Sequence, residues 1–210
     1  PDYTPDGMLE EISQIVPFFA GIRWDRLGKN GLQWPVAPDG TDTQILHQEE
    51  FKRGLGYFEF HPWEETQEIR EHGKKYPYIL ITGRRLPGFF HTENRQISWL
   101  RELHRDPTVE IHPRTAEKEG INEGDWVVIE SPRGKVRQRA KFFEGMDPRV
   151  VSAEHAWWFP EKKDAAHGWD ESNINILTDN AYETCDPAMG ATHVRTLLCR
   201  IYPENQGVDS

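Results

Sequence analysis

Six short runs of β-forming residues follow Tyr76, each bounded by turn residues, and this spacing constrains the fold more than any other feature of the chain. Runs this short, separated by glycine, proline and polar residues, predict strands rather than helices. We expect strands at 78–82, 108–112, 125–131, 135–143, 149–153 and 196–202. With two short helices among them, these strands predict a mainly β fold with short helices, arranged as a β-barrel with inserted helices.

Local signals define several connections between these strands. The Pro-Arg-Gly turn at 132–134 stands between two alternating runs, which predicts a hairpin with Gly134 at a position of positive φ. Pro113 is favoured at a helix start and Gly120 as a left-handed cap, so we expect a short helix between them. A second helix is expected at 95–103, where apolar residues recur at helical spacing.

The first third of the chain has a different character. Up to residue 76, acidic side chains outnumber basic ones by 14 to 8, and glycine and proline interrupt most patterns. One helix is expected at 6–16, with Asp6 as its N-cap and Pro17 as its end. We therefore predict an irregular, partly helical arm at 1–75, a barrel at 76–203 and a tail at 204–210.

Charge and motif content exclude several classes of function. The net charge of −10 provides no basic surface for nucleic acid, and every apolar run is far shorter than the ~20 residues of a membrane helix. Cys185 and Cys199 are too few for a disulfide framework or a cysteine-rich zinc site, and no P-loop or hydrolase motif occurs. Because the chain begins at Pro1, we expect a piece of a longer polypeptide, and its cellular compartment is left undecided.

The segment after the first predicted strand is the first candidate site. It joins a buried strand to a helix and contains residues suited to an anion: Thr82, Gly83, Arg84, Arg85, His91 and Thr92. Glycines let a backbone approach a ligand, and arginine binds phosphate through two hydrogen bonds. Across 82–115, six arginines face four acidic residues, a local excess of positive charge in an acidic chain. This excess indicates either an anionic ligand or a surface that pairs with the acidic arm.

Two later segments are also candidates. At 173–178 polar and apolar residues alternate, and Asn173 and Asn175 share one face, where paired amides can bind the edge of a heterocycle. The alternative is an ordinary asparagine-rich turn. The aromatic stretch at 155–160 predicts either core packing or a wall against a cofactor or another domain.

Taken in order, these motifs resemble the C-terminal region of molybdopterin oxidoreductases, the dimethyl sulfoxide reductase family. The motifs are YILITGR at 78–84, HT at 91–92, VEIHP at 109–113, GDWV at 124–127, SPRG at 131–134 and NINILT at 173–178. The segments FHTENRQ at 90–96 and AWWFPE at 156–161 are most similar to the anaerobic branch that contains polysulfide and thiosulfate reductase-like enzymes and acetylene hydratase.

The resemblance implies a double-psi β-barrel that binds molybdopterin guanine dinucleotide, the cofactor that holds molybdenum or tungsten. By position it implies that Thr82, Gly83, Arg84 and Arg85 line the cofactor, and that His91 and Thr92 bind its pterin or phosphate region. It further places Asn173 and Asn175 at the pterin edge, with Leu177 and Thr178 fixing their backbone, and allows close approach at Gly190.

The resemblance also implies partners. The chain would be one domain of a longer enzyme, bound to the N-terminal catalytic domains of the same polypeptide and catalytically inactive by itself. It allows an iron–sulfur cluster in that N-terminal part and an iron–sulfur electron-transfer subunit. The alternative is a free-standing double-psi barrel that acts as an interaction or accessory module. A free module should bury its tryptophans, whereas a domain of a longer chain should expose apolar side chains.

Overall fold

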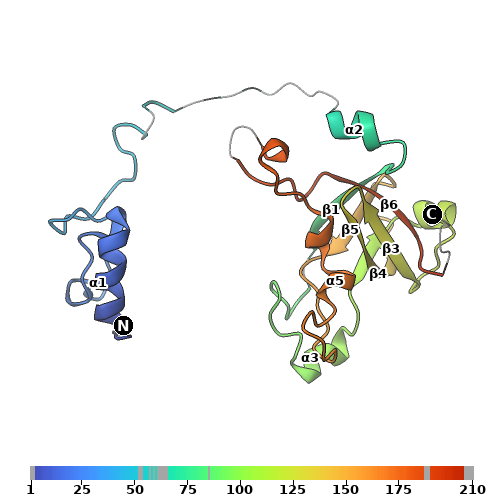
Figure 1. Cartoon of the computed structure of the whole chain (residues 1–210), viewed down its shortest axis with the longest axis horizontal. Coiled ribbons are helices and arrows are strands. Elements are labelled where there is room, and N and C mark those ends of the chain that lie inside the picture. Colours follow the sequence, from blue (N-terminus) through green and yellow to red (C-terminus); the bar gives the residue numbers. More distant parts are fainter. Residues whose placement is uncertain are drawn as a thin grey trace. The chain divides into compact units, whose positions relative to one another are not determined.

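A computed structural model describes residues 3–51, 54–56, 58, 60, 66–84, 86–186 and 190–205 (Figure 1). The chain forms two compact units, Pro1–Phe60 and His61–Ser210, and each is described here by itself. The domain limits drawn from the sequence stay a prediction. Among the described residues, no helix has both the length and the apolar character needed to cross a membrane.

The first unit contains one regular helix and two single turns. The helix α1 (Pro5–Ile15) is followed by the 3-10 turns η1 (Pro17–Phe19) and η2 (Trp24–Arg26). The N-cap of α1 is Thr4, whose hydroxyl accepts a hydrogen bond from the amide of Gly7, so the expectation that Asp6 caps the helix is wrong. Pro5 occupies the first helical position, which moves the cap one residue before it.

The second unit is a closed six-stranded barrel. Its strands are β1 (Tyr78–Arg84), β2 (Thr108–Ile111), β3 (Trp126–Ser131), β4 (Gly134–Phe142), β5 (Val150–Glu154) and β6 (Leu197–Pro203). They close in the order β1-β5-β2-β4-β3-β6, with β1–β5 and β2–β4 parallel and the other neighbours antiparallel. The predicted mainly β fold class and double-psi barrel are confirmed.

Short helices connect the strands. They are α2 (Gln67–His72), α3 (Ser98–Leu103), α4 (Pro113–Glu119), α5 (Trp169–Ser172), η3 (Ile174–Leu177) and η4 (Tyr182–Thr184). The start of α4 and its left-handed cap Gly120, with φ 66°, are as predicted. α3 begins three residues later than predicted, because Asn94 has φ 70° and the chain is not yet helical at Arg95.

The barrel interior is filled by alternating aliphatic residues of the strands, with Leu80, Val109, Ile111, Val127 and Ile129 fully buried. The β3–β4 hairpin forms as predicted, but Gly134 does not have positive φ. Instead, a Cβ atom at Gly134 would lie 2.9 Å from Cγ2 of Ile176. Glycine is therefore required there by the close approach of η3, and the sequence-based reason for it is wrong.

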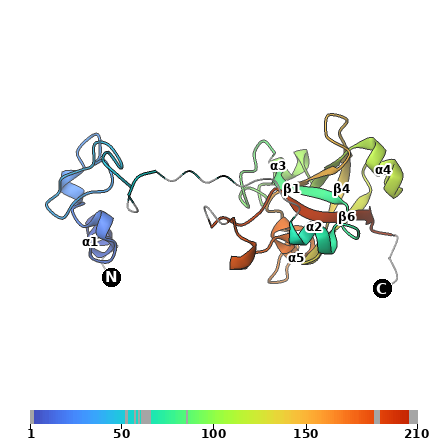
Figure 2. The same ribbon diagram turned by 90° about the horizontal axis from the view of Figure 1, so that it is seen from above.

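Strand directions define two ends of the barrel. β1, β3 and β5 finish at one end, where β2, β4 and β6 start, and we call it the loop end. The long connection at 155–196 leaves and re-enters the barrel there. The opposite end carries α4, and we call it the helix end. Figure 2 shows α4 and the orange-to-red part of that connection at opposite ends of the barrel.

Candidate functional site

The exit of β1 and the entry to β6 lie side by side at the loop end. Thr82 is buried, and its hydroxyl donates a hydrogen bond to the carbonyl of Val194. Gly83 is exposed, and a Cβ atom there would lie 3.9 Å from Nε of Arg195. Two segments that are far apart in sequence thus meet at the first predicted site residues.

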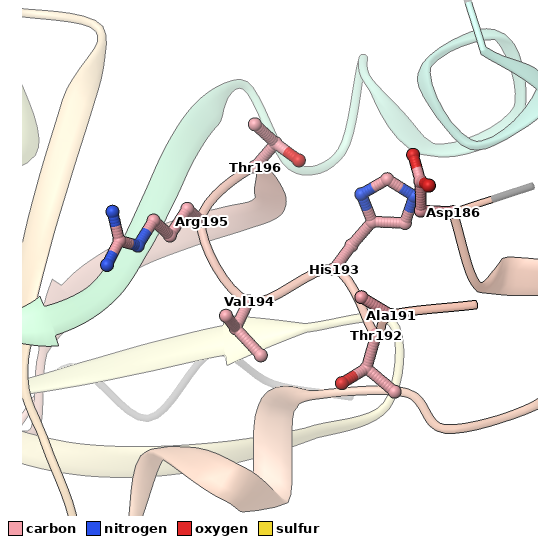
Figure 3. Close-up of a pocket in the computed structure, with 7 residues that line it drawn as sticks. All are labelled: Asp186, Ala191, Thr192, His193, Val194, Arg195 and Thr196. Atoms are coloured by element: carbon pink, nitrogen blue, oxygen red, sulfur yellow. The ribbon is translucent and has the colours of Figure 1, made fainter. Parts of the chain in front are cut away.

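A pocket of about 350 Å³ opens at the entry to β6 (Figure 3). Its lining residues are Asp186, Ala191, Thr192, His193, Val194, Arg195 and Thr196. Asp186 and His193 lie on one side, whereas the side chain of Arg195 points to the other, towards β1. Arg195 is exposed, and its guanidinium has no ion pair or hydrogen bond within the described part of the chain. The side of the pocket next to β1 therefore carries a positive charge that no described residue pairs, and the carboxylate of Asp186 lines the opposite side.

Arg84, which the sequence singled out, is already paired inside the barrel. Its Nε lies 3.0 Å from Oε1 of Glu110, and its side chain also contacts the buried Glu154 at 3.8 Å. The hydroxyl of Thr108 accepts a further hydrogen bond from it. These partners belong to β2 and β5 rather than to the arm. Arg85, the other arginine of the prediction, lies outside the described residues.

His91 and Thr92 are held by the chain that follows β5. Nδ1 of His91 lies 3.0 Å from Nε2 of His155, a hydrogen bond between two imidazoles. The indole nitrogen of Trp158 donates to the carbonyl of Thr92 at 2.6 Å. The two candidate residues are therefore fixed to the exit of β5 and not only to their own loop.

The asparagine segment packs over the β3–β4 hairpin. The side-chain oxygen of Asn173 accepts from the amide of Asn175 at 3.0 Å, which starts the turn η3. Leu177 is buried, its carbonyl accepts from Ser131, and Thr178 donates to the carbonyl of Asn175. The side-chain amide of Asn175 is exposed and makes no hydrogen bond to the residues that are described.

Gly190 closes a turn before the pocket. It has φ 68°, and its amide donates to the carbonyl of Asp186 at 2.7 Å. No atom lies within 4 Å of the position of a Cβ there, so its backbone conformation, and not crowding, favours glycine.

Two residues important to this end were missed from the sequence. Gln138 is fully buried, and its amide donates to the carbonyls of Glu154 and Ser172 while accepting from the amide of Glu154. It thereby joins the exit of β5 to the segment that carries Asn173. A polar residue on the inward face of a strand, between Val136 and Ala140, was the available signal. The second missed residue is Arg195, and the available signal was its position as a lone arginine just before a buried strand.

The aromatic stretch at 155–160 proves to be mostly core. Trp157 and Phe159 are buried, which matches the packing interpretation. Trp158 is partly exposed and makes the hydrogen bond to Thr92. A second hollow of about 500 Å³ lies beside this region and is mostly apolar: Leu86, Pro87, Gly88, Phe89, Phe90 and Asn94 line it.

The loop end carries groups that can bind a ligand. It presents a guanidinium, hydroxyls, amides and backbone donors, which suit anionic groups and the polar edges of rings. Within the described ranges, no three His, Cys, Asp or Glu residues are placed to hold a metal ion. Burial raises the pKa of the Cys199 thiol, so this cysteine is not a nucleophile.

Comparisons with known proteins agree with this geometry. The model of the family described as "Molydopterin dinucleotide binding domain" matches residues 78–195. A dopamine dehydroxylase from Eggerthella lenta is 47% identical over 135 residues, which cover 63% of this chain and 13% of that protein. The F420-dependent formate dehydrogenase 2 subunit alpha of Methanococcus maripaludis is 34% identical over 84% of this chain and 25% of its own length.

The solved structure of acetylene hydratase from Pelobacter acetylenicus is similar with a TM-score of 0.64 and 22% identity. The match covers 88% of this chain and 28% of that one, and at this identity it supports the fold alone. The chain thus spans a quarter or less of the length of the two curated relatives named above.

Proposed function

The chain belongs to the molybdopterin dinucleotide-binding domain family, and from this premise we propose that its loop end binds molybdopterin guanine dinucleotide within a larger molybdenum or tungsten oxidoreductase. When bound, this cofactor supplies the metal centre and its sulfur ligands. The residues of this chain bind and orient it. The observation that carries the proposal is Arg195, which has no ion pair among the described residues and lies in an open pocket beside the backbone of Gly83.

The donor set fits a dinucleotide. A diphosphate needs positive charge and N–H donors, which Arg195 and the backbone of Gly83 can supply. A pterin or purine edge needs paired donors and acceptors, which the exposed amide of Asn175 beside Asn173 can supply. His91 and Thr92 are proposed to bind the same cofactor from the β1 side. Arg84 supports this site through its ion pairs rather than through its own free charge.

Exposed aromatic side chains support the role as one domain of a longer enzyme. Trp24, Trp34, Trp99 and Trp169 are each at least 44% exposed, and Phe58 is almost fully exposed. A free-standing module would be expected to bury such side chains, whereas a domain covered by others would not. We propose that the N-terminal catalytic domains of the same polypeptide cover part of this surface, and that the chain alone turns over no substrate.

The test uses the full-length protein purified from its native source or expressed with its maturation factors. We expect a mass several times 24.5 kDa, molybdenum or tungsten by elemental mass spectrometry, and guanosine monophosphate released by acid hydrolysis. A native protein of the size of this chain, without metal or pterin, would refute the proposal.

Point variants localise the site. Asn175→Ala and His91→Ala should each lower the pterin and metal content several-fold while the protein stays folded, because both remove polar groups from the loop end. Asn122→Ala is the matched control, since its amide bonds Asp125 at the helix end. Unchanged pterin and metal content in both variants would exclude these residues from the site.

A further inference from the structure

Arg95 is a buried charged side chain that lies against two aromatic rings. It is 1% exposed, and its guanidinium carbon lies 4.8 Å from the ring centre of Phe89 and 4.7 Å from that of Trp157. It forms no salt bridge with any residue that the structure describes, and burial lowers the pKa of its guanidinium. A buried charge of this kind is costly unless hydrogen bonds compensate it.

Two hydrogen bonds provide that compensation, and both end on backbone carbonyls. One terminal nitrogen of Arg95 donates to the carbonyl of Glu93 at 3.0 Å. The other donates to the carbonyl of His155 at 3.1 Å. Nε of Arg95 is buried and has no hydrogen-bond partner in the described part of the chain. The guanidinium therefore joins its own loop to the first residue after β5.

The two carbonyls that accept hydrogen bonds from Arg95 lie in the segments that hold His91 and Thr92 in place. Glu93 follows Thr92 directly, and its carboxylate accepts from the amide of His91 at 2.7 Å. His155 is also the residue whose ring bonds the ring of His91. Arg95 thus fixes the backbone of His155 directly, and it fixes that of Glu93, whose carboxylate binds the amide of His91.

We propose that Arg95 is a positioning residue that holds His91 and Thr92 in the conformation that binds the cofactor. This inference rests on the proposed function. An apolar side chain could fill the space between the two rings without the cost of a buried charge and an unpaired Nε. Only a planar, two-pronged donor can bind both carbonyls at once. The choice of arginine is explained by loop geometry rather than by stability.

The experiment compares variants of the full-length protein. Arg95→Met keeps most of the apolar packing and removes both hydrogen bonds. Arg95→Lys keeps the charge but cannot bind both carbonyls at once. Arg101→Met is the control, because the Arg101 guanidinium also lies over Trp157, at 5.0 Å, but its side chain pairs with the exposed Glu161.

Two quantities are measured for each variant: hydrogen exchange of the amides at 89–93 and the pterin content. For Arg95→Met we expect exchange at 89–93 to accelerate about tenfold or more, with exchange in β3 and β4 unchanged, and pterin content to fall several-fold. Arg95→Lys should give the same pattern in weaker form. A truncated variant, Arg95→Ala, should regain pterin when reconstituted with millimolar ethylguanidinium, which a general loss of stability would not permit.

The outcomes separate this inference from the proposed function. Faster exchange at 89–93 with full pterin content would overturn the positioning role while leaving cofactor binding intact. Exchange that accelerates equally in β3 and β4 would also overturn it, because the effect would then be a loss of barrel stability. If the full-length wild-type protein itself holds no pterin, the proposed function fails, whatever the exchange at 89–93.

Discussion

The two ends of the barrel are built from the same strands but differ in how their connections are held. At the helix end, short connections are closed by local bonds: Gly120 caps α4, and Asp147 pairs with Arg149 at 2.8 Å. At the loop end, the connection at 155–196 is held by side chains from distant strands, such as Gln138 and Thr82. The difference shows that local bonds suffice for the short connections, whereas the long connection, which carries the proposed binding groups, depends on contacts with distant strands.

The largest effect is expected from a substitution in the barrel core, which supports both ends. Ile129 is fully buried in the barrel core. We expect Ile129→Ala to lower the free energy of unfolding by about 2–5 kcal/mol, because the lost methylene contacts leave a cavity. Chemical denaturation of the full-length protein measures this, with the exposed Glu117→Ala as control. Equal stability of the two variants would contradict the assignment of the core.

Substitution of one buried polar residue at each end then tests the difference between the two ends. Gln138→Leu leaves the carbonyls of Glu154 and Ser172 without this donor, and Thr115→Val does the same to the carbonyl of Pro148 at the helix end. Each should cost about 1–3 kcal/mol of stability.

Only Gln138→Leu should also lower pterin content, since it alone loosens the segment of Asn173. The comparison fails if Thr115→Val lowers pterin content as much as Gln138→Leu does.

Much of the barrel could be predicted because its signals are local. The strand runs, the hairpin and the Pro113-to-Gly120 helix depend on neighbouring residues, and the structure reproduces them within one or two residues. Contacts between distant segments could not be predicted. Gly134 is constrained by Ile176, and Arg84 by Glu110, and neither pairing leaves a pattern in the sequence.

For the candidate site, the sequence predicted which segments come together but not which of their side chains are paired. Residues at 82–84, 91–92 and 173–178 do gather at the loop end. The roles of these residues in binding stay a prediction, and sequence could not tell which arginine is paired within the barrel. Arg84 meets two carboxylates, whereas Arg195 meets none among the described residues.

A smaller effect is expected on the pH dependence of the unfolding free energy. Burial acts to raise the pKa of Glu130, but hydrogen bonds from Arg200 and Tyr202 outweigh it and hold the pKa below the ordinary 4.5. A lowered pKa stabilises the fold above the unfolded-state value, and this stabilisation is lost as the pH falls through the folded-state pKa. We therefore expect unfolding free energy to fall below about pH 4.5.

The Glu130→Gln variant should be less stable than the wild type at pH 7, and its unfolding free energy should depend less on pH in the acid range. Burial, followed by the hydrogen bond to Glu130, raises the pKa of Tyr202 to about 12, so absorbance titration of the variant should show that pKa falling. A Tyr202 pKa that stays at its wild-type value would show that the contact is not made.

The smallest effect is expected at the helix end. Hydrogen bonds from Arg149 hold the pKa of Asp147 well below its usual range, but the pair is exposed. Exposed pairs contribute little. Asp147→Asn should therefore leave stability at neutral pH and pterin content nearly unchanged, and a clear loss of pterin would mean that the helix end also takes part in binding.

The most direct test of the account compares two unpaired arginines at opposite ends. Arg195 lies in the loop-end pocket, and Arg114 is exposed at the start of α4; neither has an ion pair among the described residues. Each is replaced by alanine in the full-length protein, and released guanosine monophosphate and pterin are measured per polypeptide. The account predicts a loss of about tenfold for Arg195→Ala and none for Arg114→Ala. Equal cofactor content in the two variants would contradict it.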